Sequence, residues 1–279
     1  MKIIILLLTL FYCVVIRSKC YSAAMEHILD ILTVQHLALA VFVAVGAGMV
    51  KGIVGFAMPM IFVSGLSTFL APELALAGLI LPTLCTNVIQ ALRQGPSAAW
   101  NSVKKFKVFL IFGLLTLIVG AQLVRLLPLP TMLLIIGLPI TLFALLQLTG
   151  VDVKLPSQTF RVAASVGAFA GFMGGLSGIW GPPTVAYLTA LGTNKDDHMR
   201  IQGVIYGLGA VALTVAHLGS GVLRTETLPF SLAMVPPALL GLWLGGRVFD
   251  RIDQVVFRRA TLVVLLIAGL NLVRRAAMF

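Results

Sequence analysis

A single lysine lies inside an apolar stretch of the chain, where lysines are rare. Lys51 is the only formally charged residue within the apolar segments of this 279-residue sequence. A lysine at the centre of a bilayer costs about 2.5–3.5 kcal/mol on insertion scales, so its ammonium should face a cavity or a partner. Beside helix-terminal amides, such a cation would bind an anion. The alternative is a lysine nearer the interface whose head group reaches water.

A glycine motif surrounds this lysine and recurs later in the chain. The same spacing of three glycines and a proline occurs 123 residues apart, as Gly48, Gly52, Gly55 and Pro59 and as Gly171, Gly175, Gly178 and Pro182. Because proline lacks a backbone donor, we predict that a helix breaks near mid-membrane at each copy. Backbone groups exposed at two such breaks are typical of a transporter's substrate site. The alternative for the first two glycines of each copy is close helix packing.

A few polar and aromatic residues complete the predicted site. Asn87 and Ser177 could line a substrate path, although such residues are more often hydrogen-bond partners between helices. Trp180 stands directly before the second break and could gate the path or only pack. The predicted substrate-binding residues are Lys51, Gly52, Gly55, Pro59, Asn87, Gly175, Ser177, Gly178, Trp180 and Pro182.

The composition places these residues in a membrane. Hydrophobic residues make up 59% of the chain, charged residues 10%, and the mean hydropathy is +1.07, which excludes a water-soluble domain. We interpret the net charge of +11 as interfacial anchors and orientation signals, and we reject nucleic-acid binding. Arg274 and Arg275 belong to these anchors in this interpretation. Three cysteines without a Cys/His cluster indicate neither a metal nor a cofactor.

The apolar runs predict an all-α polytopic membrane protein with about eight transmembrane helices. The segments are 36–63, 74–92, 108–124, 131–149, 162–190, 201–219, 229–246 and 260–273. With the glycine motif, they form two internal four-span repeats, 36–149 and 161–276, each opening with a broken helix. An even number of spans per half predicts parallel copies. The basic loops at Arg93 and Arg247 would then face opposite sides, against the positive-inside rule, unless one segment is re-entrant.

The first 24 residues are expected to lie outside this fold. Lys2 precedes an apolar run of signal-peptide length, and Ser22-Ala23-Ala24 resembles a cleavage site. Arg17 and Lys19 after the run are atypical of a signal peptide. A misassigned start, with Met25 as the true first residue, is therefore an equally good interpretation.

The paired glycine and proline motifs, each in the first span of a four-span half, resemble the TauE/SafE family of sulfite exporters and related anion permeases. The resemblance covers Val41 to the C-terminus. It implies a multi-pass protein of the plasma membrane, of the bacterial inner-membrane type, that transports sulfite, organosulfonates or related organic anions.

From the residues themselves we expect a secondary transporter of small anions driven by a proton or substrate gradient, since no phosphate-binding loop motif occurs. The first alternative is an intramembrane enzyme, which would need paired carboxylates, a His cluster or a nucleophile with a base at membrane depth. The apolar segments contain no Asp or Glu. The second alternative is a membrane scaffold subunit that transports nothing.

Overall fold

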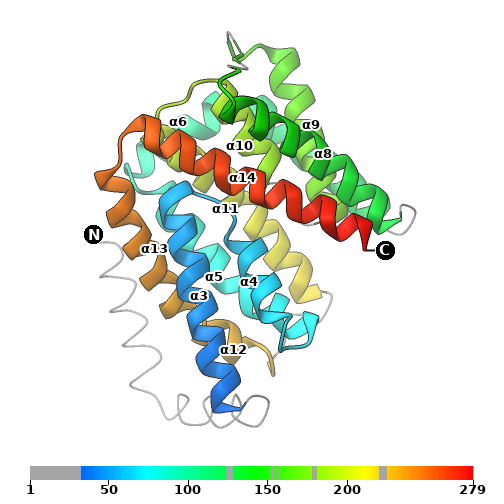
Figure 1. Cartoon of the computed structure of the whole chain (residues 1–279), viewed down its shortest axis with the longest axis vertical. Coiled ribbons are helices and arrows are strands. Elements are labelled where there is room, and N and C mark those ends of the chain that lie inside the picture. Colours follow the sequence, from blue (N-terminus) through cyan, green and yellow to red (C-terminus); the bar gives the residue numbers. More distant parts are fainter. Residues whose placement is uncertain are drawn as a thin grey trace.

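The computed structural model describes residues 33–123, 128–151, 154–155, 157–177, 181–219 and 225–278 (Figure 1). The predicted leader, 1–24, lies outside them. Regular structure in the described residues is helical. The helices are α3 (Val34–Val54), α4 (Met58–Leu66), α5 (Pro72–Ala91), α6 (Pro96–Lys105), α7 (Lys107–Leu123), α8 (Leu129–Leu148), α9 (Phe160–Ser177), α10 (Gly181–Ala190), α11 (Lys195–Gly219), α12 (Leu228–Ala233), α13 (Val235–Arg251) and α14 (Gln254–Ala277).

Several helices have the length and composition of membrane spans. Within the described residues, Val34–Val54, Leu74–Ala91, Leu228–Arg251 and Gln254–Ala277 are long and apolar enough to cross a bilayer, and Lys107–Gly120 and Gly137–Leu148 are shorter apolar helices. Large apolar side chains such as Phe42, Ile118 and Ile267 are exposed. Such exposure suits contact with lipid. The prediction of a helical multi-pass membrane protein is confirmed, while the described spans are less uniform than eight equal helices.

The first glycine motif ends a helix and reverses the chain. Thr33 caps α3 by accepting a hydrogen bond from the His36 backbone N–H. The helix ends at Val54, and Gly55 and Ala57 then adopt left-handed φ values of 88° and 70°. These two residues, on either side of Phe56, turn the backbone sharply, so α4 runs back along α3 and brings Gly65 against Val43. The predicted break is present, and the segment forms a helical hairpin.

The second glycine motif also lies where one helix ends and the next begins. Helix α9 ends at Ser177 and α10 begins at Gly181, while residues 178–180 are outside the described part. The backbone N–H of Leu155, just before α9, donates to the carbonyl of Ala190 at the end of α10 over 2.8 Å. The end of α10 therefore returns to the start of α9. The α9–α10 pair is a second helical hairpin.

Each hairpin packs along a helix from the other half of the chain. Helix α3 lies against α13 (Figure 1), and the contacts between helices also place α9 against α7. A Cβ atom added at Gly48 would lie 2.3 Å from the Ala238 carbonyl oxygen, and one at Gly171 would lie 1.9 Å from that of Gly113. Backbones this close leave no room for a side chain. These glycines serve helix packing, the alternative that the sequence left open.

The remaining long helices pair in antiparallel fashion. In α5 and α11, Asn87 lies beside Gly207 and Ala91 lies beside Gly203, so the numbering runs in opposite directions. In α8 and α14, the Gly137 position contacts Leu272 and the Gly269 position contacts Thr141, which is again antiparallel. Helices α5 and α11 each follow one of the hairpins and would correspond in the two predicted repeats. Parallel copies would therefore make α5 and α11 run in the same direction. These directions do not fit the expected parallel copies, because α4 turns back along α3 where the sequence predicted one long first segment.

The connections that carry most of the basic residues meet at one end of the molecule. Arg93 after α5 forms an ion pair with Asp250 at the end of α13. Contacts from Arg200 to Ser102, from Gln158 to the Lys105 carbonyl and from Lys195 to the Ile252 carbonyl join the other connections. We call the surface formed by residues 93–107, 154–155, 157–161, 191–200 and 247–259 the basic face. The loops at Arg93 and Arg247 therefore lie on the same side, and the expected conflict with the positive-inside rule does not arise.

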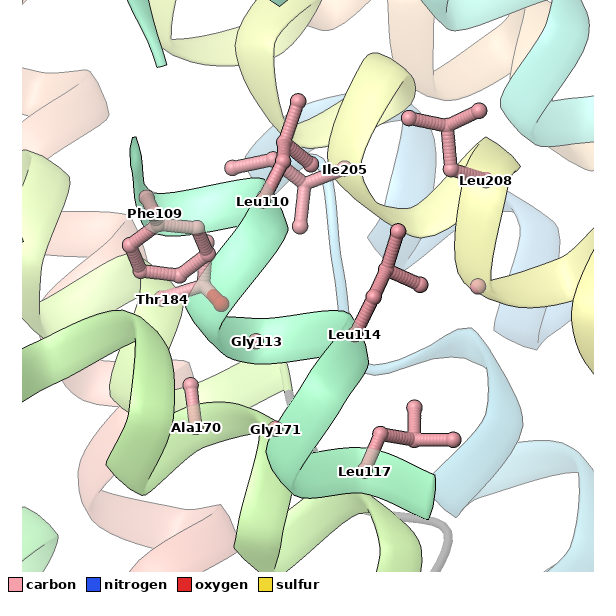
Figure 2. A pocket seen from close by; sticks show the side chains of 11 residues that line it. Phe109, Leu110, Gly113, Leu114, Leu117, Ala170, Gly171, Thr184, Ile205 and Leu208 are labelled. Atoms are coloured by element: carbon pink, nitrogen blue, oxygen red, sulfur yellow. The ribbon is translucent and has the colours of Figure 1, made fainter. Parts of the chain in front are cut away.

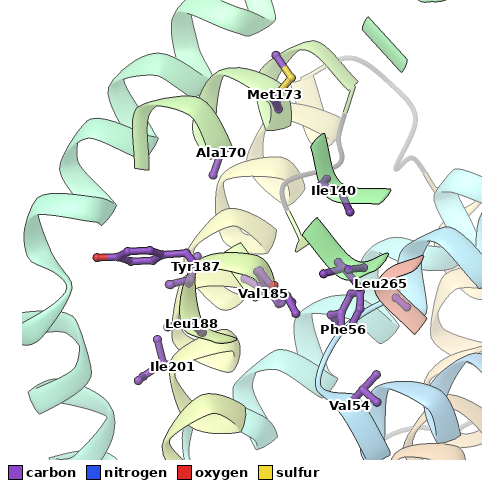
Figure 3. Close-up of a cluster of buried hydrophobic side chains, with 14 of the residues drawn as sticks. Val54, Phe56, Ile140, Ala170, Met173, Val185, Tyr187, Leu188, Ile201 and Leu265 are labelled. Carbon is purple, nitrogen blue, oxygen red and sulfur yellow. The ribbon is translucent and has the colours of Figure 1, made fainter. Parts of the chain in front are cut away.

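The largest apolar core surrounds α10 and anchors both hairpins. Val185 and Leu188 of α10 are fully buried, and the Tyr187 ring stacks on Phe109 of α7 with centroids 5.6 Å apart. Phe56, from the turn between α3 and α4, lies in the same cluster near Leu265 of α14 (Figure 3). Burial of apolar groups from both halves fixes the tip of the first hairpin against the start of the second.

Candidate substrate site

A cavity of about 500 Å³ lies between the two hairpins and helices α5, α11 and α14. Its lining is mostly apolar with a few polar groups, as in sites for small molecules. The lining residues described below are Lys51, Pro59, Ser64, Thr83, Asn87, Gly174, Gly175, Gly181, Pro182, Tyr206, Ala210, Asn271 and Arg275.

Lys51 places its charge at the inner end of this cavity. It belongs to the last turn of α3, and only 1% of the residue is exposed. The ammonium donates a hydrogen bond to the Asn87 side-chain oxygen. Within the described residues no carboxylate forms an ion pair with it. The asparagine is neutral and the negative end of the α3 dipole is only partial compensation, so net positive charge remains at the cavity wall.

Two further donors beside Lys51 lack partners. The side-chain amide nitrogen of Asn87 and the hydroxyl of Thr83 are buried and make no hydrogen bond. Buried polar groups in folded proteins are nearly always hydrogen-bonded, so unpaired groups that line a cavity suit a ligand. An ammonium, an amide and a hydroxyl together offer donors to the oxygens of a small oxyanion.

The starts of the two returning helices also line the cavity. Helix α4 begins beside Pro59, and α10 begins at Gly181 and Pro182. The N-terminal end of a helix carries partial positive charge, and both ends add to the potential from Lys51. The Tyr206 hydroxyl donates to the Gly181 carbonyl oxygen over 2.9 Å, which fixes the first turn of α10. The arrangement suits an anion in charge and in the direction of its donors.

A buried polar cluster separates the cavity from the basic face. The amide nitrogen of Gln90 donates to the carbonyl oxygens of Gly55 and Met199, over 3.0 and 2.9 Å. Gln202, in the amide orientation that satisfies its surroundings, donates to the Gly55 carbonyl and accepts from His198. We call Gln90, His198 and Gln202 the inner cluster. It joins the end of α3 to α5 and α11 directly behind Lys51.

The cavity reaches exposed residues in the opposite direction. Its lining includes Ser64 near the end of α4 and Arg275 near the end of α14, and both are exposed. Lys51 is buried at the other end. The cavity is therefore closed toward the basic face and reaches the surface on the far side of the molecule.

Half of the predicted site residues line this cavity. They are Lys51, Pro59, Asn87, Gly175 and Pro182. Three others lie where the structure gives no description of the side chain or the residue. The side chain of Ser177 and the residues Gly178 and Trp180 fall outside the described part of the chain.

The last two predicted residues, Gly52 and Gly55, lie next to the site and serve the packing of the fold. A Cβ atom at Gly52 would lie 2.5 Å from the Leu242 carbonyl oxygen, so Gly52 faces α13 and belongs to the helix contact. A Cβ atom at Gly55 would lie 1.7 Å from the nearer atom of the Gln202 side-chain amide. Gly55 thus allows the turn between α3 and α4 and the contact with the inner cluster.

Sequence reasoning missed most of the lining, including Thr83, Tyr206 and Arg275. Thr83 lies four residues before Asn87 on α5, so helical spacing would have placed it on the same face. Tyr206 follows Thr83 by 123 residues, which is the spacing of the glycine motif. Arg275 was interpreted as an interfacial anchor, and no local signal separates it from Arg274.

A second pocket is less suited to an anion. It encloses about 40 Å³ between α7, α9 and α11, and its lining is apolar apart from Thr184 (Figure 2). Leu114, Leu117 and Leu208 surround it without a charged group. The larger cavity with Lys51 is therefore the candidate site.

Comparison with known proteins supports the same class of protein. No curated protein and no solved structure matched the chain. The family profile described as sulfite exporter TauE/SafE matches residues 40–272. This range includes both hairpins, Lys51 and Asn87, and it confirms the resemblance seen in the glycine and proline motifs. The chain belongs to the TauE/SafE sulfite exporter family of membrane transporters.

Proposed function

We propose that the chain is a secondary transporter of sulfite, organosulfonates or related small organic anions, and that it binds the anion at Lys51 between the two hairpins. The observation that carries the proposal is a buried ammonium in a cavity of about 500 Å³ with two unpaired donors beside it. Lys51 and Asn87 supply charge and one amide donor, and Thr83 supplies a hydroxyl. Pro59, Gly175 and Pro182 let the backbone approach the anion.

The proposed transport cycle alternates access to Lys51 from the two faces. In the described conformation the inner cluster closes the cavity toward the basic face. Transport requires a second conformation in which Gln90, Gln202 and His198 separate and the far side closes. Basic loops favour the cytoplasmic side, so the basic face is cytoplasmic in this proposal and the cavity opens outward. The membrane is the plasma membrane, of the bacterial inner-membrane type.

The same proposal relates the two halves, 36–149 and 161–276, as inverted repeats. Four helix pairs support it: α3 with α13 matches α9 with α7, while α5 pairs with α11 and α8 with α14. A two-fold axis in the membrane plane would turn each pair into its counterpart. Such an axis also makes a second conformation available, in which the halves exchange roles around the site.

Anion flux into proteoliposomes containing only this chain tests the function. We would measure uptake of sulfite, sulfoacetate, sulfate and simple carboxylates, with and without an imposed proton gradient. Saturable uptake of sulfite or sulfoacetate that Lys51→Met abolishes supports the proposal. Absence of uptake for every anion would favour the scaffold alternative, and the gradient shows whether protons drive the flux.

A further inference from the structure

Arg275 is the second basic residue that lines the cavity, and the proposed function gives it no role. Among the described residues, Lys51 and Arg275 are the two cations of the lining, and the lining contains no acidic side chain. Lys51 is buried and Arg275 is exposed. The two charges therefore mark the inner and outer ends of one cavity.

The position of Arg275 in the fold argues against a role as an orientation signal. Helix α14 begins at Gln254 on the basic face and ends at Ala277, and its 24 residues extend for about 36 Å. Arg275, in the last turn, lies at the opposite end. The positive-inside rule depletes basic residues on that side, so the rule does not account for an arginine there.

Neighbouring residues separate Arg275 from an ordinary interfacial arginine. Arg274 is also exposed, and its guanidinium donates to the Asn271 side-chain oxygen over 3.0 Å. Arg274 does not line the cavity, whereas Asn271 and Arg275 do. Both arginines are exposed, but Arg274 bonds to Asn271 and does not line the cavity, whereas Arg275 lines the path that leads to Lys51.

We propose that Arg275 is the outer anion-recruiting residue of this cavity, so that an anion meets its guanidinium at the mouth before it reaches Lys51. This inference rests on the proposed function for its substrate, an oxyanion. A guanidinium presents several donors in a planar fork that matches the oxygens of sulfonate, sulfite or carboxylate. Charge at the mouth of a low-dielectric cleft raises the local concentration of the opposite ion.

The first test measures the electrostatic potential at the mouth without any transport assay. In a chain whose three native cysteines are replaced by serine, Ser64→Cys places a thiol on the cavity lining. We would compare its rates of modification by an anionic and a cationic methanethiosulfonate. In each reaction the thiolate attacks the reagent sulfur, a mixed disulfide forms and methanesulfinate leaves. The ratio of the two rates cancels differences in access and thiol reactivity.

The arginine neighbours provide the matched variants for this test. Arg275→Gln should lower the ratio of anionic to cationic rates by about threefold or more, Arg275→Lys should retain it, and Arg274→Gln should change it far less. No change in Arg275→Gln, or an equal change in Arg274→Gln, would overturn the role of Arg275 because the potential would then be a property of the whole surface.

The second test measures transport in the same variants. For uptake from the face that carries Arg275, Arg275→Gln should raise KM several-fold with little change in kcat, since the lost contact precedes the translocation step. Uptake from the basic face should change less. If the wild type carries no anion in the panel, the proposed function fails, while the thiol ratio still decides whether Arg275 recruits anions.

Discussion

The two hairpins share one shape and differ in chemistry. In both, a glycine-rich helix ends close to the cavity and the chain returns as a short helix whose second residue is a proline. At positions 123 residues apart that line the cavity, the first half has Lys51, Thr83 and Asn87 and the second has Gly174, Tyr206 and Ala210. At these three pairs of positions the first half of the chain supplies the donors and the second supplies space, apart from the Tyr206 hydroxyl, which donates to the Gly181 carbonyl oxygen. Similar hairpins can therefore bring different charges to the wall of one cavity.

Lys51→Met should lower anion flux more than any other change, because Lys51 is the charge that distinguishes the first hairpin from the second. The change keeps the length of the apolar stem and removes the charge, so it should lower anion flux by about 10- to 100-fold, the loss of a charge-assisted contact. Insertion should be unchanged or improved. Flux in proteoliposomes, normalised to inserted protein, measures the effect. Lys107→Met, an exposed lysine on the basic face, is the control, and equal losses in both variants would disprove a specific role.

Gly55→Ala should have the next largest effect because it changes the hairpin turn itself. Its φ of 88° strains any other residue, and the new methyl group would collide with Gln202. Gly95 has a φ of 91° and nothing within 4 Å of its Cβ position. Gly95→Ala therefore carries the strain without the collision. We expect a lower unfolding temperature in detergent and lower flux for Gly55→Ala; indistinguishable variants would mean that the inner cluster tolerates the methyl group.

Asn87→Ala should have a smaller effect that distinguishes a binding residue from a packing residue. It removes the partner of Lys51 and one free donor, so we expect KM for the anion to rise about 10-fold. Titration of flux against anion concentration gives KM and kcat separately. Thr86→Ala is the matched control, since Thr86 is equally buried on α5 but bonds to the Pro82 carbonyl of its own helix. A fall in kcat alone would assign Asn87 to the conformational change.

Gly48→Ala and Gly171→Ala should have the smallest effect on flux per folded protein. Each side chain would enter a contact between backbones, of α3 with α13 or of α9 with α7, and should cost about 1–3 kcal/mol of stability. Gly46→Ala is the control because nothing lies within 4 Å of its Cβ position. The unfolding temperatures of the two variants should fall by similar amounts. A fall in only one of them would show that the two halves do not share this packing.

The sequence by itself determined the class of the protein and the places where its helices break. Long apolar runs with few charges require a bilayer, and Gly55 with Pro59 cannot continue a regular helix. The cost of a charge in an apolar segment singled out Lys51. The spacing of two similar motifs indicated two related halves. Each of these conclusions depends on local composition or on a distance along the chain.

Only the tertiary structure decided the opposite directions of α5 and α11, the partners of the glycines and the extent of the cavity. The turn at Gly55 and Ala57 reverses the chain, and the resulting change in the number of crossings could not be counted from hydropathy. Gly48 and Gly52 contact α13, nearly 200 residues later, and spacing along one helix does not reveal its neighbour. Arg275 and Lys51 share a cavity because α14 crosses the molecule, and of the two adjacent arginines only Arg275 lines that cavity.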